Sequence, residues 1–530
     1  MVTTLYTHPR ILLPGTAPGA QRADAILVKR GTITAVGERR ALRDAAPSAR
    51  EVALPGAAIV AGFHDAHIHT GSVARDMDAV DLRAARHKQE ALDTLRGYLT
   101  ERPGTGWVSG GYWDANGWPG GLPSRHDLDR VCADRPVALS SLDGHSIWVN
   151  SLGLRRVGID AASPDPAGGL ILRDADGREP SGVLRESAAD AVIELAEREL
   201  NDALPALLER AQERLLAMGL THLTDLDGES TRLSFESMRA AGRLKLRVHK
   251  GIPHEDLDRA IDEGWRTGSG DRWITTGPVK LFSDGALGSH SAHMLSDFAD
   301  DPGNHGVEVL PVEELAALVV RANSRGIAVA THAIGDRANR NVLDAYAAAV
   351  AITRAAGLRN RIEHAQHIAR DDIARFAELG VVASLQPTHC TTDFRLARRR
   401  LGDRALANYA WRSLLNSGAR VAFGSDAPIE PANPMYGVHA AVTRQNRASE
   451  PVGGFEPDER LGVDEALGLY SAGAAYAAGL ETVTGRIAAG NFADFVALDA
   501  DPHAVDPAAL ATISAAATIV DGDVVYASNR

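Results

Sequence analysis

The sequence predicts an α/β protein: a (β/α)8 TIM-type barrel, a small composite β-sandwich domain built from both chain ends, and a large insertion after barrel strand 1. Three observations predict this fold. Strand-like and amphipathic helical segments alternate through the middle of the chain, and short β-rich runs occur at both ends. Several strand-like segments also end in a histidine, a lysine or an aspartate. Polar residues at the carboxyl ends of strands are typical of a functional site on a barrel.

The composition is that of a globular protein and excludes several kinds of partner. The chain has 530 residues, of which 45% are hydrophobic and 24% charged. Its formal net charge of −13 disfavours nucleic acid and anionic membrane surfaces as partners. The sequence shows no signal-peptide pattern and no apolar run long enough to span a membrane. We therefore expect a cytoplasmic protein that acts on a small molecule.

The two cysteines, Cys132 and Cys390, are too few for a disulfide framework or a thiolate metal cluster. A metal ion in this protein would need histidine, carboxylate or modified side chains as ligands. The oligomeric state cannot be read from the sequence, and a homo-oligomer is compatible with it.

Both chain ends are rich in strand-forming residues. Two β-rich runs within Ala25–Gly37 are separated by Arg30-Gly31, and similar runs follow at Ala493–Asp499 and Thr518–Tyr526, the last with an Asp-Gly turn. A lone hairpin is only marginally stable in water. We therefore expect the ends, residues 1–56 and 481–530, to pair as one composite β domain around a barrel at 57–480.

Eight strand-like runs are separated by amphipathic helical segments, and this count favours a barrel over an open doubly wound sheet. The expected barrel strands are Ala57–His64, Leu220–Leu226, Leu244–Lys250, Val279–Ser283, Ile327–His332, Arg361–Ala365, Val381–Gln386 and Val421–Asp426.

The connection after the first strand, residues 71–205, is far longer than an ordinary β-α loop. It contains the Gly- and Trp-rich stretch Gly110–Gly121 and the apolar run Pro136–Leu142, so we expect it to fold as a subdomain. Long loops on the carboxyl side of a barrel usually shape the ligand pocket, and we expect this one to cover the active site. A spacer remote from the site is the alternative.

The segment Gly62-Phe-His-Asp-Ala-His-Ile-His69 contains the first candidate ligands. On a strand, residues at i and i+2 point to the same face, so His67 and His69 converge, whereas alternation places His64 on the opposite face and Asp65 on theirs. A His-x-His pair alone is weak evidence for a metal site.

Lys280, His332, His364 and Asp426 lie in or at the ends of four other expected strands. A buried lysine is costly unless it is neutralised, paired or modified. Each residue alone could be a hydrogen-bonded core or loop residue. Together with the histidine pair, however, they would form one polar rim at the carboxyl end of the barrel.

These segments resemble the metal-dependent amidohydrolase superfamily, and in detail its N-substituted formamide deformylase-like branch, amidohydrolase family 3. The resemblance keeps the motif order from about residue 25 to the last strand. The matching segments are Gly62–His69, Asp143–Asn150, Val279–Ser289, Thr331–Asp336, Arg361–His364, Gly424–Pro428 and Gly490–Asp499.

The resemblance implies one or two divalent metal ions, with zinc expected. One ion would be held by the first histidine pair and the aspartate, and a second by the other two histidines. The lysine, as a carbamate formed with carbon dioxide, would bridge them and supply the anionic charge that two neighbouring cations require. The implied ligands are His67, His69, Lys280, His332, His364 and Asp426.

The reaction that the resemblance implies is hydrolysis of a non-peptide carbon–nitrogen bond in an amide, N-acyl or formamide-like compound. Metal-bound hydroxide would attack the carbonyl carbon, and Asp426 would accept a proton and pass it to the leaving amine. Ester, lactone or carbamate hydrolysis would use the same chemistry. A catalytically silent regulatory protein is a further alternative, against which the complete ligand set argues.

His145, His389 and Trp113 are candidates for substrate contact. With Trp107, Tyr112, Trp118 and Trp148, Trp113 belongs to an aromatic set in the insertion. This set suggests an apolar or aromatic portion of the substrate, or else forms the core of the subdomain. The sequence leaves both interpretations open.

Overall fold

The computed structural model describes residues 3–13, 23–77, 79–115, 118–119, 121–142, 146–166, 169–175 and 177–528. The chain forms two compact units, residues 1–72 with 209–530 and residues 73–208. Over the described residues, no helix has both the length and the apolar character needed to cross a membrane.

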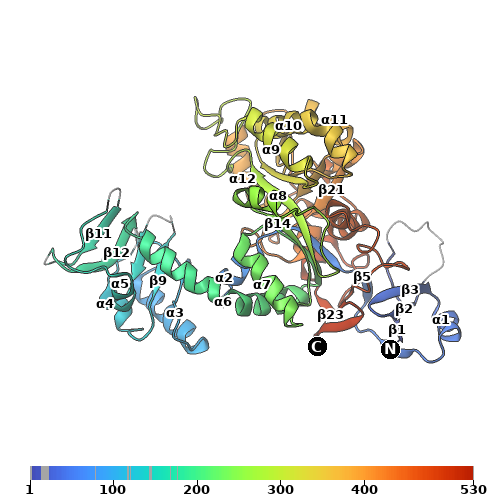
Figure 1. Ribbon diagram of the computed structural model, residues 1–530, viewed down its shortest axis with the longest axis horizontal. Helices are drawn as coiled ribbons and strands as arrows, with labels where there is room; N and C mark the ends of the chain where they lie inside the picture. The colour runs from blue at the N-terminus through green and yellow to red at the C-terminus, as the bar shows by residue number, and fades with distance from the viewer. Residues whose placement is uncertain are drawn as a thin grey trace. The chain divides into compact units, whose positions relative to one another are not determined.

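The larger unit contains an eight-stranded parallel sheet in the order β21-β19-β17-β16-β15-β14-β13-β6, which confirms the predicted barrel. Helices α9 to α11 gather on one side of it (Figure 1). The strands are β6 (Phe63–Ile68), β13 (Leu220–Asp225), β14 (Arg247–Ile252), β15 (Ile274–Phe282), β16 (Val329–Ala333), β17 (Arg361–His364), β19 (Val382–Leu385) and β21 (Arg420–Phe423). The helices from α6 onward are α6 (Asp190–Ala217), α7 (Glu229–Ala240), α8 (Leu257–Asp262), α9 (Val312–Asn323), α10 (Asp336–Ala355), α11 (Ile373–Leu379), α12 (Pro387–Leu401), α13 (Trp411–Asn416), α14 (Pro434–Thr443), α15 (Val463–Gly468) and α16 (Ala474–Ala477).

Two backbone hydrogen bonds join the first and last barrel strands at their carboxyl ends. The Asp426 N–H donates to the His67 carbonyl oxygen at 2.7 Å, and the His69 N–H donates to the Ala427 carbonyl oxygen at 2.9 Å. These bonds place three of the predicted ligands beside one another although more than half of the chain separates them in sequence.

The predicted first strand, Ala57–His64, is wrong in its bounds because it covers two different strands. Residues of β5 (Ala58–Ala61) pair antiparallel with β22 (Phe495–Leu498) in the β domain, and the barrel begins only at β6. Gly62 lies at the passage between them, where a Cβ atom would come within 2.3 Å of the Thr221 Oγ1 atom. A continuous apolar run does not reveal such a change of sheet.

Strand β6 carries an irregularity that the alternation argument for His64 and Asp65 does not take into account. Leu223 of β13 lies opposite Asp65 of β6, and Asp225 lies opposite Ile68. Three residues along β6 therefore correspond to two residues along β13. Alternation does not hold across such a bulge. His64 stacks on the ring of His222 with centroids 5.5 Å apart, and its Nε2 atom lies 3.0 Å from the Thr224 hydroxyl oxygen.

Two four-stranded sheets form the β domain from strands of both chain ends, as the fold class predicts (Figure 1). Their inner faces share one hydrophobic core, in which the rings of Tyr6 and Phe495 pack edge to face at 5.3 Å. One sheet contains β1 (Thr3–Thr7), β2 (Ala25–Lys29), β3 (Thr32–Gly37) and β4 (Arg50–Ala53), and the other contains β5, β22, β23 (Ala515–Val520) and β24 (Asp523–Ala527).

Replacing Phe495 with alanine is expected to lower the free energy of unfolding by about 3–5 kcal/mol, because it opens a cavity in this shared core. The side chain is fully buried. Chemical denaturation followed by circular dichroism measures the change. Val524, which is 46% exposed on β24, supplies the control, since its alanine variant should shift stability by no more than about 0.5 kcal/mol. Equal shifts in both variants would contradict a core shared by the two ends.

The second unit, residues 73–208, has its own six-stranded sheet in the order β11-β12-β10-β9-β8-β7 and its own hydrophobic cores. The rings of Trp113, Trp118 and Trp148 pack against one another with centroids 6.1–6.3 Å apart. The strands are β7 (Val80–Asp81), β8 (Gly110–Trp113), β9 (Ala138–Ser141), β10 (Ser146–Val149), β11 (Gly169–Arg173) and β12 (Pro180–Glu186), with helices α3 (Lys88–Glu101), α4 (Arg125–Asp129) and α5 (Ser151–Val157).

Candidate metal centre

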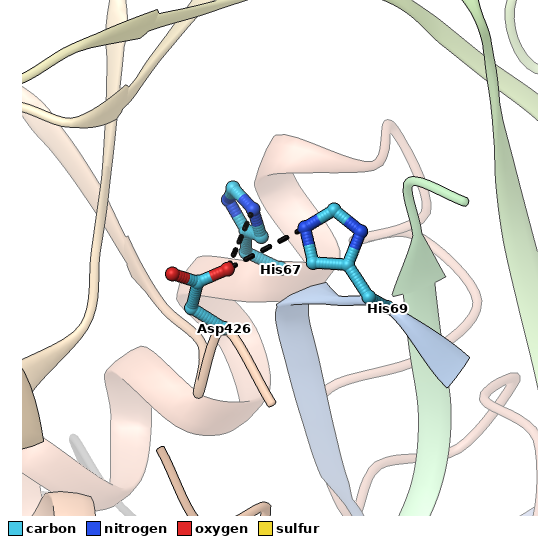
Figure 2. A group of neighbouring side chains, drawn as sticks. All are labelled: His67, His69 and Asp426. Carbon is cyan, nitrogen blue, oxygen red and sulfur yellow. Dashed lines mark ion pairs between the residues drawn. The ribbon is translucent and has the colours of Figure 1, made fainter. Parts of the chain in front are cut away.

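His67, His69 and Asp426 converge at the carboxyl end of the barrel, as the sequence predicts. The Asp426 Oδ1 atom lies 3.4 Å from the His67 Nε2 atom and 3.5 Å from the His69 Nε2 atom. Figure 2 shows both rings directed toward this single carboxylate oxygen. Their ligand atoms lie within 4.8 Å of one another, which is compact enough for one metal ion.

A second compact group consists of His364, His389 and Asp426, whose ligand atoms also lie within 4.8 Å of one another. The His389 Nε2 atom lies 3.1 Å from the other carboxylate oxygen of Asp426, Oδ2. Burial alone would raise the pKa of Asp426, but hydrogen bonds from His389 and His69 outweigh it and hold that pKa well below its usual range. Asp426 is therefore an anion between two groups of imidazoles.

The His67 ring fits a metal ligand. Its Nδ1 atom lies 2.6 Å from the Glu363 Oε2 atom, whereas its buried Nε2 atom has no hydrogen-bond partner among the described residues. Burial, followed by the charge of Lys280, lowers the pKa of His67 to about 4. A neutral ring that donates from Nδ1 presents the Nε2 lone pair, which is the atom that a divalent cation needs.

Two further rings are oriented in the same way. The His69 Nδ1 atom lies 3.0 Å from the Asp227 Oδ1 atom, and the His364 Nδ1 atom lies 3.0 Å from the Gln386 Oε1 atom. Burial lowers the pKa of His69, but its bonds to Asp227 and Asp426 outweigh burial and raise it to about 9. Such outer partners fix the ring orientation and direct each Nε2 toward Asp426, where a metal ion would take the place of the proton on the His69 Nε2 atom.

The backbone is strained at two of the expected ligands. His364 has φ 74° and Asp426 has φ 60°, in the left-handed region that residues other than glycine seldom adopt. Each such residue costs on the order of 1–3 kcal/mol and persists where the surrounding structure holds it, commonly at functional sites. The left-handed conformation of His364 ends strand β17 and interrupts the alternation of side chains. The consecutive residues Glu363 and His364 can therefore both lie at the candidate metal site, Glu363 against His67 and His364 near Asp426.

Lys280 lies on β15, is 3% exposed and makes neither a hydrogen bond nor an ion pair with the described residues. Its Nζ atom lies 5.0 Å from the centroid of the Phe282 ring. Burial lowers the pKa of Lys280 to about 8, against the opposing charges of Glu363 and Asp426. A buried amine that makes no hydrogen bond or ion pair within the described ranges is compatible with the predicted carbamate, which stays a prediction.

His332 lies beside the centre but belongs to neither compact group. Its ring centroid is 4.5 Å from that of His364, while its Nε2 atom lies 3.1 Å from the Gly285 carbonyl oxygen. Its role as a metal ligand stays a prediction.

The three predicted substrate contacts have different outcomes. His389 lies at the centre, whereas His145 lies outside the described residues. Trp113 is 3% exposed, and its indole N–H donates to the Leu139 carbonyl oxygen at 2.7 Å. This burial favours the interpretation of the aromatic set as subdomain core.

Sequence reasoning missed the residues that orient the histidine rings, namely Glu363, Asp227 and Gln386. Glu363 had a usable signal, because a charged residue inside a buried strand requires a partner, and Arg361 and His67 provide it. Asp227 and Gln386 follow the ends of other strands, and nothing in their spacing pairs them with particular histidines. Asp65 accepts hydrogen bonds from the backbone N–H groups of His67 and Ser425 rather than from a ring.

Replacing Asp227 with asparagine is expected to weaken metal binding by about 10–100-fold. Asparagine keeps an oxygen near the His69 Nδ1 atom but loses the charge that makes the ring a stronger ligand. Competition with a chromophoric chelator measures the affinity. Asp262→Asn, at an exposed position on α8, is the control and should leave the affinity unchanged. Superimposable titration curves for both variants would contradict this role of Asp227.

Comparison with known proteins shows the family of this chain. The Amidohydrolase family matches residues 50–526. The chain is 35% identical over 518 residues to amidohydrolase YtcJ of Bacillus subtilis (strain 168), covering 95% of this chain and 96% of the relative. It is 31% identical over 523 residues to N-substituted formamide deformylase of Arthrobacter pascens, covering 95% of each.

An uncharacterized metal-dependent hydrolase from Pyrococcus furiosus has a similar structure, with a TM-score of 0.77 and 26% identity over 94% of this chain and 99% of that one. The fold and the site thus define a metal-dependent hydrolase. The chain belongs to the amidohydrolase family.

Proposed function

We propose that the protein hydrolyses a carbon–nitrogen bond other than a peptide bond, in an amide, N-acyl or formamide-like small molecule. The observation that carries the proposal is the group formed by His67, His69 and Asp426. The Nε2 atom of His67, which has no hydrogen-bond partner in the described part of the chain, is directed into this group. The 31% identity to a protein named N-substituted formamide deformylase supports this class of substrate.

The residues present fit a divalent cation. His67, His69 and Asp426 would hold one ion, with zinc proposed. A second ion and a carbamate on Lys280 that bridges the two belong to the same proposal, together with His332 and His364 as ligands. When bound, such a metal lowers the pKa of a coordinated water to about 7 and polarises the scissile carbonyl.

Asp426 is the residue best placed to move a proton. It is an anion at the centre of the site, and it would accept a proton from the attacking water and return it to the departing amine nitrogen. His389 lies against its Oδ2 atom and would hold the carboxylate in place, next to the substrate. The imidazoles of His67 and His69 are fixed by Glu363 and Asp227 and do not need to move during the reaction.

The setting of this activity follows from the sequence. We propose a cytoplasmic enzyme whose substrate is a small molecule, without a nucleic-acid or membrane partner, and the net charge of −13 supports the exclusion of nucleic acid. We also propose that the insertion shapes the substrate pocket.

Parallel assays test the reaction. Protein supplied with zinc would be incubated with N-substituted formamides, with other N-acyl compounds and with esters and lactones matched to them in structure. Release of the amine at a rate well above that of the matched alcohol would support the proposal. Preferential cleavage of esters, lactones or carbamates would favour the alternative hydrolase. No turnover of any compound by fully loaded protein would favour a regulatory protein.

A further inference from the structure

The two carboxylate oxygens of Asp426 face different histidines. Oδ1 lies 3.4 Å from the His67 Nε2 atom and 3.5 Å from that of His69, whereas Oδ2 lies 3.1 Å from the Nε2 atom of His389. A carboxylate arranged in this way can bind two cations, one through each oxygen. His389 is not among the ligands that the family resemblance implies.

His389 is held rigidly in this position. It lies in the first turn of α12, whose first residue, Pro387, comes directly after Gln386, the residue that anchors the His364 ring. The His389 side chain is buried, and its ring centroid lies 6.1 Å from that of His364 in an edge-to-face arrangement. The ligand atoms of His364, His389 and Asp426 thus form a group as compact as that of the first metal position.

His332, which the resemblance places at the second metal position, is oriented differently. Its Nε2 atom lies 3.1 Å from the Gly285 carbonyl oxygen, which can only accept a hydrogen bond. Neither of the two compact groups of ligand atoms among the described residues includes His332. The His332 Nε2 atom also lies 3.3 Å from the Asp284 Oδ1 atom. The Asp284 carboxylate is held in place because it accepts hydrogen bonds from the backbone N–H groups of His293, Ile334 and Gly335.

We propose that His389 is a further ligand of the second divalent cation, together with His364 and Asp426, and that Asp426 bridges the two metal positions through its separate oxygens. Two imidazoles and a carboxylate are a ligand set that suits zinc and its substitute cobalt. This inference rests on the proposed function, since it assumes a metal centre, but it assigns a ligand that the resemblance does not provide.

Metal counting tests the assignment without reference to activity. Wild type, His389→Ala and His332→Ala would be stripped, reloaded with cobalt(II), freed of excess metal and examined by elemental analysis and visible absorption. We expect two ions per chain in wild type and one in His389→Ala, with a changed absorption spectrum. His439→Ala, which removes another buried histidine from neighbouring α14, is the matched control and should keep both ions. If the alanine variant at 389 does not fold, His389→Gln, which retains a hydrogen-bond donor to Asp426, should also bind one ion.

Loss of the second ion in the 389 variants supports the proposal whatever His332→Ala does. Retention of two ions and an unchanged spectrum would overturn it, and so would a wild-type protein that binds only one ion. Equal loss in His439→Ala would also overturn it, because the loss would then reflect general damage. The amide assay is independent of these results: two ions without amide hydrolysis would contradict the proposed reaction and leave this ligand assignment intact.

Discussion

Replacing Asp426 with asparagine is expected to lower the rate of hydrolysis by about 10²–10⁴-fold, the loss typical when a general base is removed. Asparagine keeps the size of the side chain and one carbonyl oxygen, but it cannot accept the proton of the attacking water. Since that oxygen remains a weak metal ligand, much of the metal should stay bound when metal is in excess. The measurement is the turnover rate at saturating metal, with the metal content determined on the same sample.

Asp227→Asn separates the loss of the base from the loss of metal. Both variants remove one negative charge near His69, but Asp227 contacts the Nδ1 side of that ring, away from the reacting groups. At saturating metal, Asp227→Asn should recover most of the wild-type rate, whereas Asp426→Asn should not. Recovery of the wild-type rate by Asp426→Asn at high metal would contradict its role as the base.

Replacing Lys280 with alanine is expected to remove bound metal and activity together. The loss of metal affinity should exceed the roughly 10–100-fold expected when a residue that only hydrogen-bonds a metal ligand is removed. The physical reason is charge: two neighbouring cations require an anionic bridge, which a carbamate on this buried amine would supply. Added formate, acetate or propionate should then restore part of the metal content and of the rate, because a short carboxylate can occupy the vacated space. An unchanged metal content and rate would refute the bridging role.

Lys250 provides a matched control on the adjacent strand β14. It is as buried as Lys280, but its ammonium pairs with Asp225 at 3.0 Å and donates to nearby carbonyl oxygens. Lys250→Ala should therefore destabilise the fold by about 3–5 kcal/mol, since it leaves Asp225 unpaired. Short carboxylates should not restore metal in this variant. Restoration in both variants would mean that carboxylates act on metal binding in general.

Much of the architecture could be predicted because it depends on local patterns. Alternating apolar runs and amphipathic segments identified the barrel, and the β-rich ends identified the composite domain. The error at Ala57–His64 arose because residues on both sides of Gly62 are equally apolar, although they pair with different sheets. The alternation argument that sets His64 apart from the ligands assumes regular pairing, which a bulge in β6 interrupts, but His64 does lie outside both compact groups of ligand atoms.

The sequence by itself determined that His67, His69, His364 and Asp426 meet at the carboxyl end of the barrel, because residues at strand ends meet at one rim whatever the loops do. It did not determine how those side chains are oriented. The Nδ1 partners Glu363, Asp227 and Gln386 direct three imidazoles toward Asp426, and the His332 Nε2 atom lies against the Gly285 carbonyl oxygen. These contacts join residues far apart in the chain, and only the closed barrel brings them within hydrogen-bond distance.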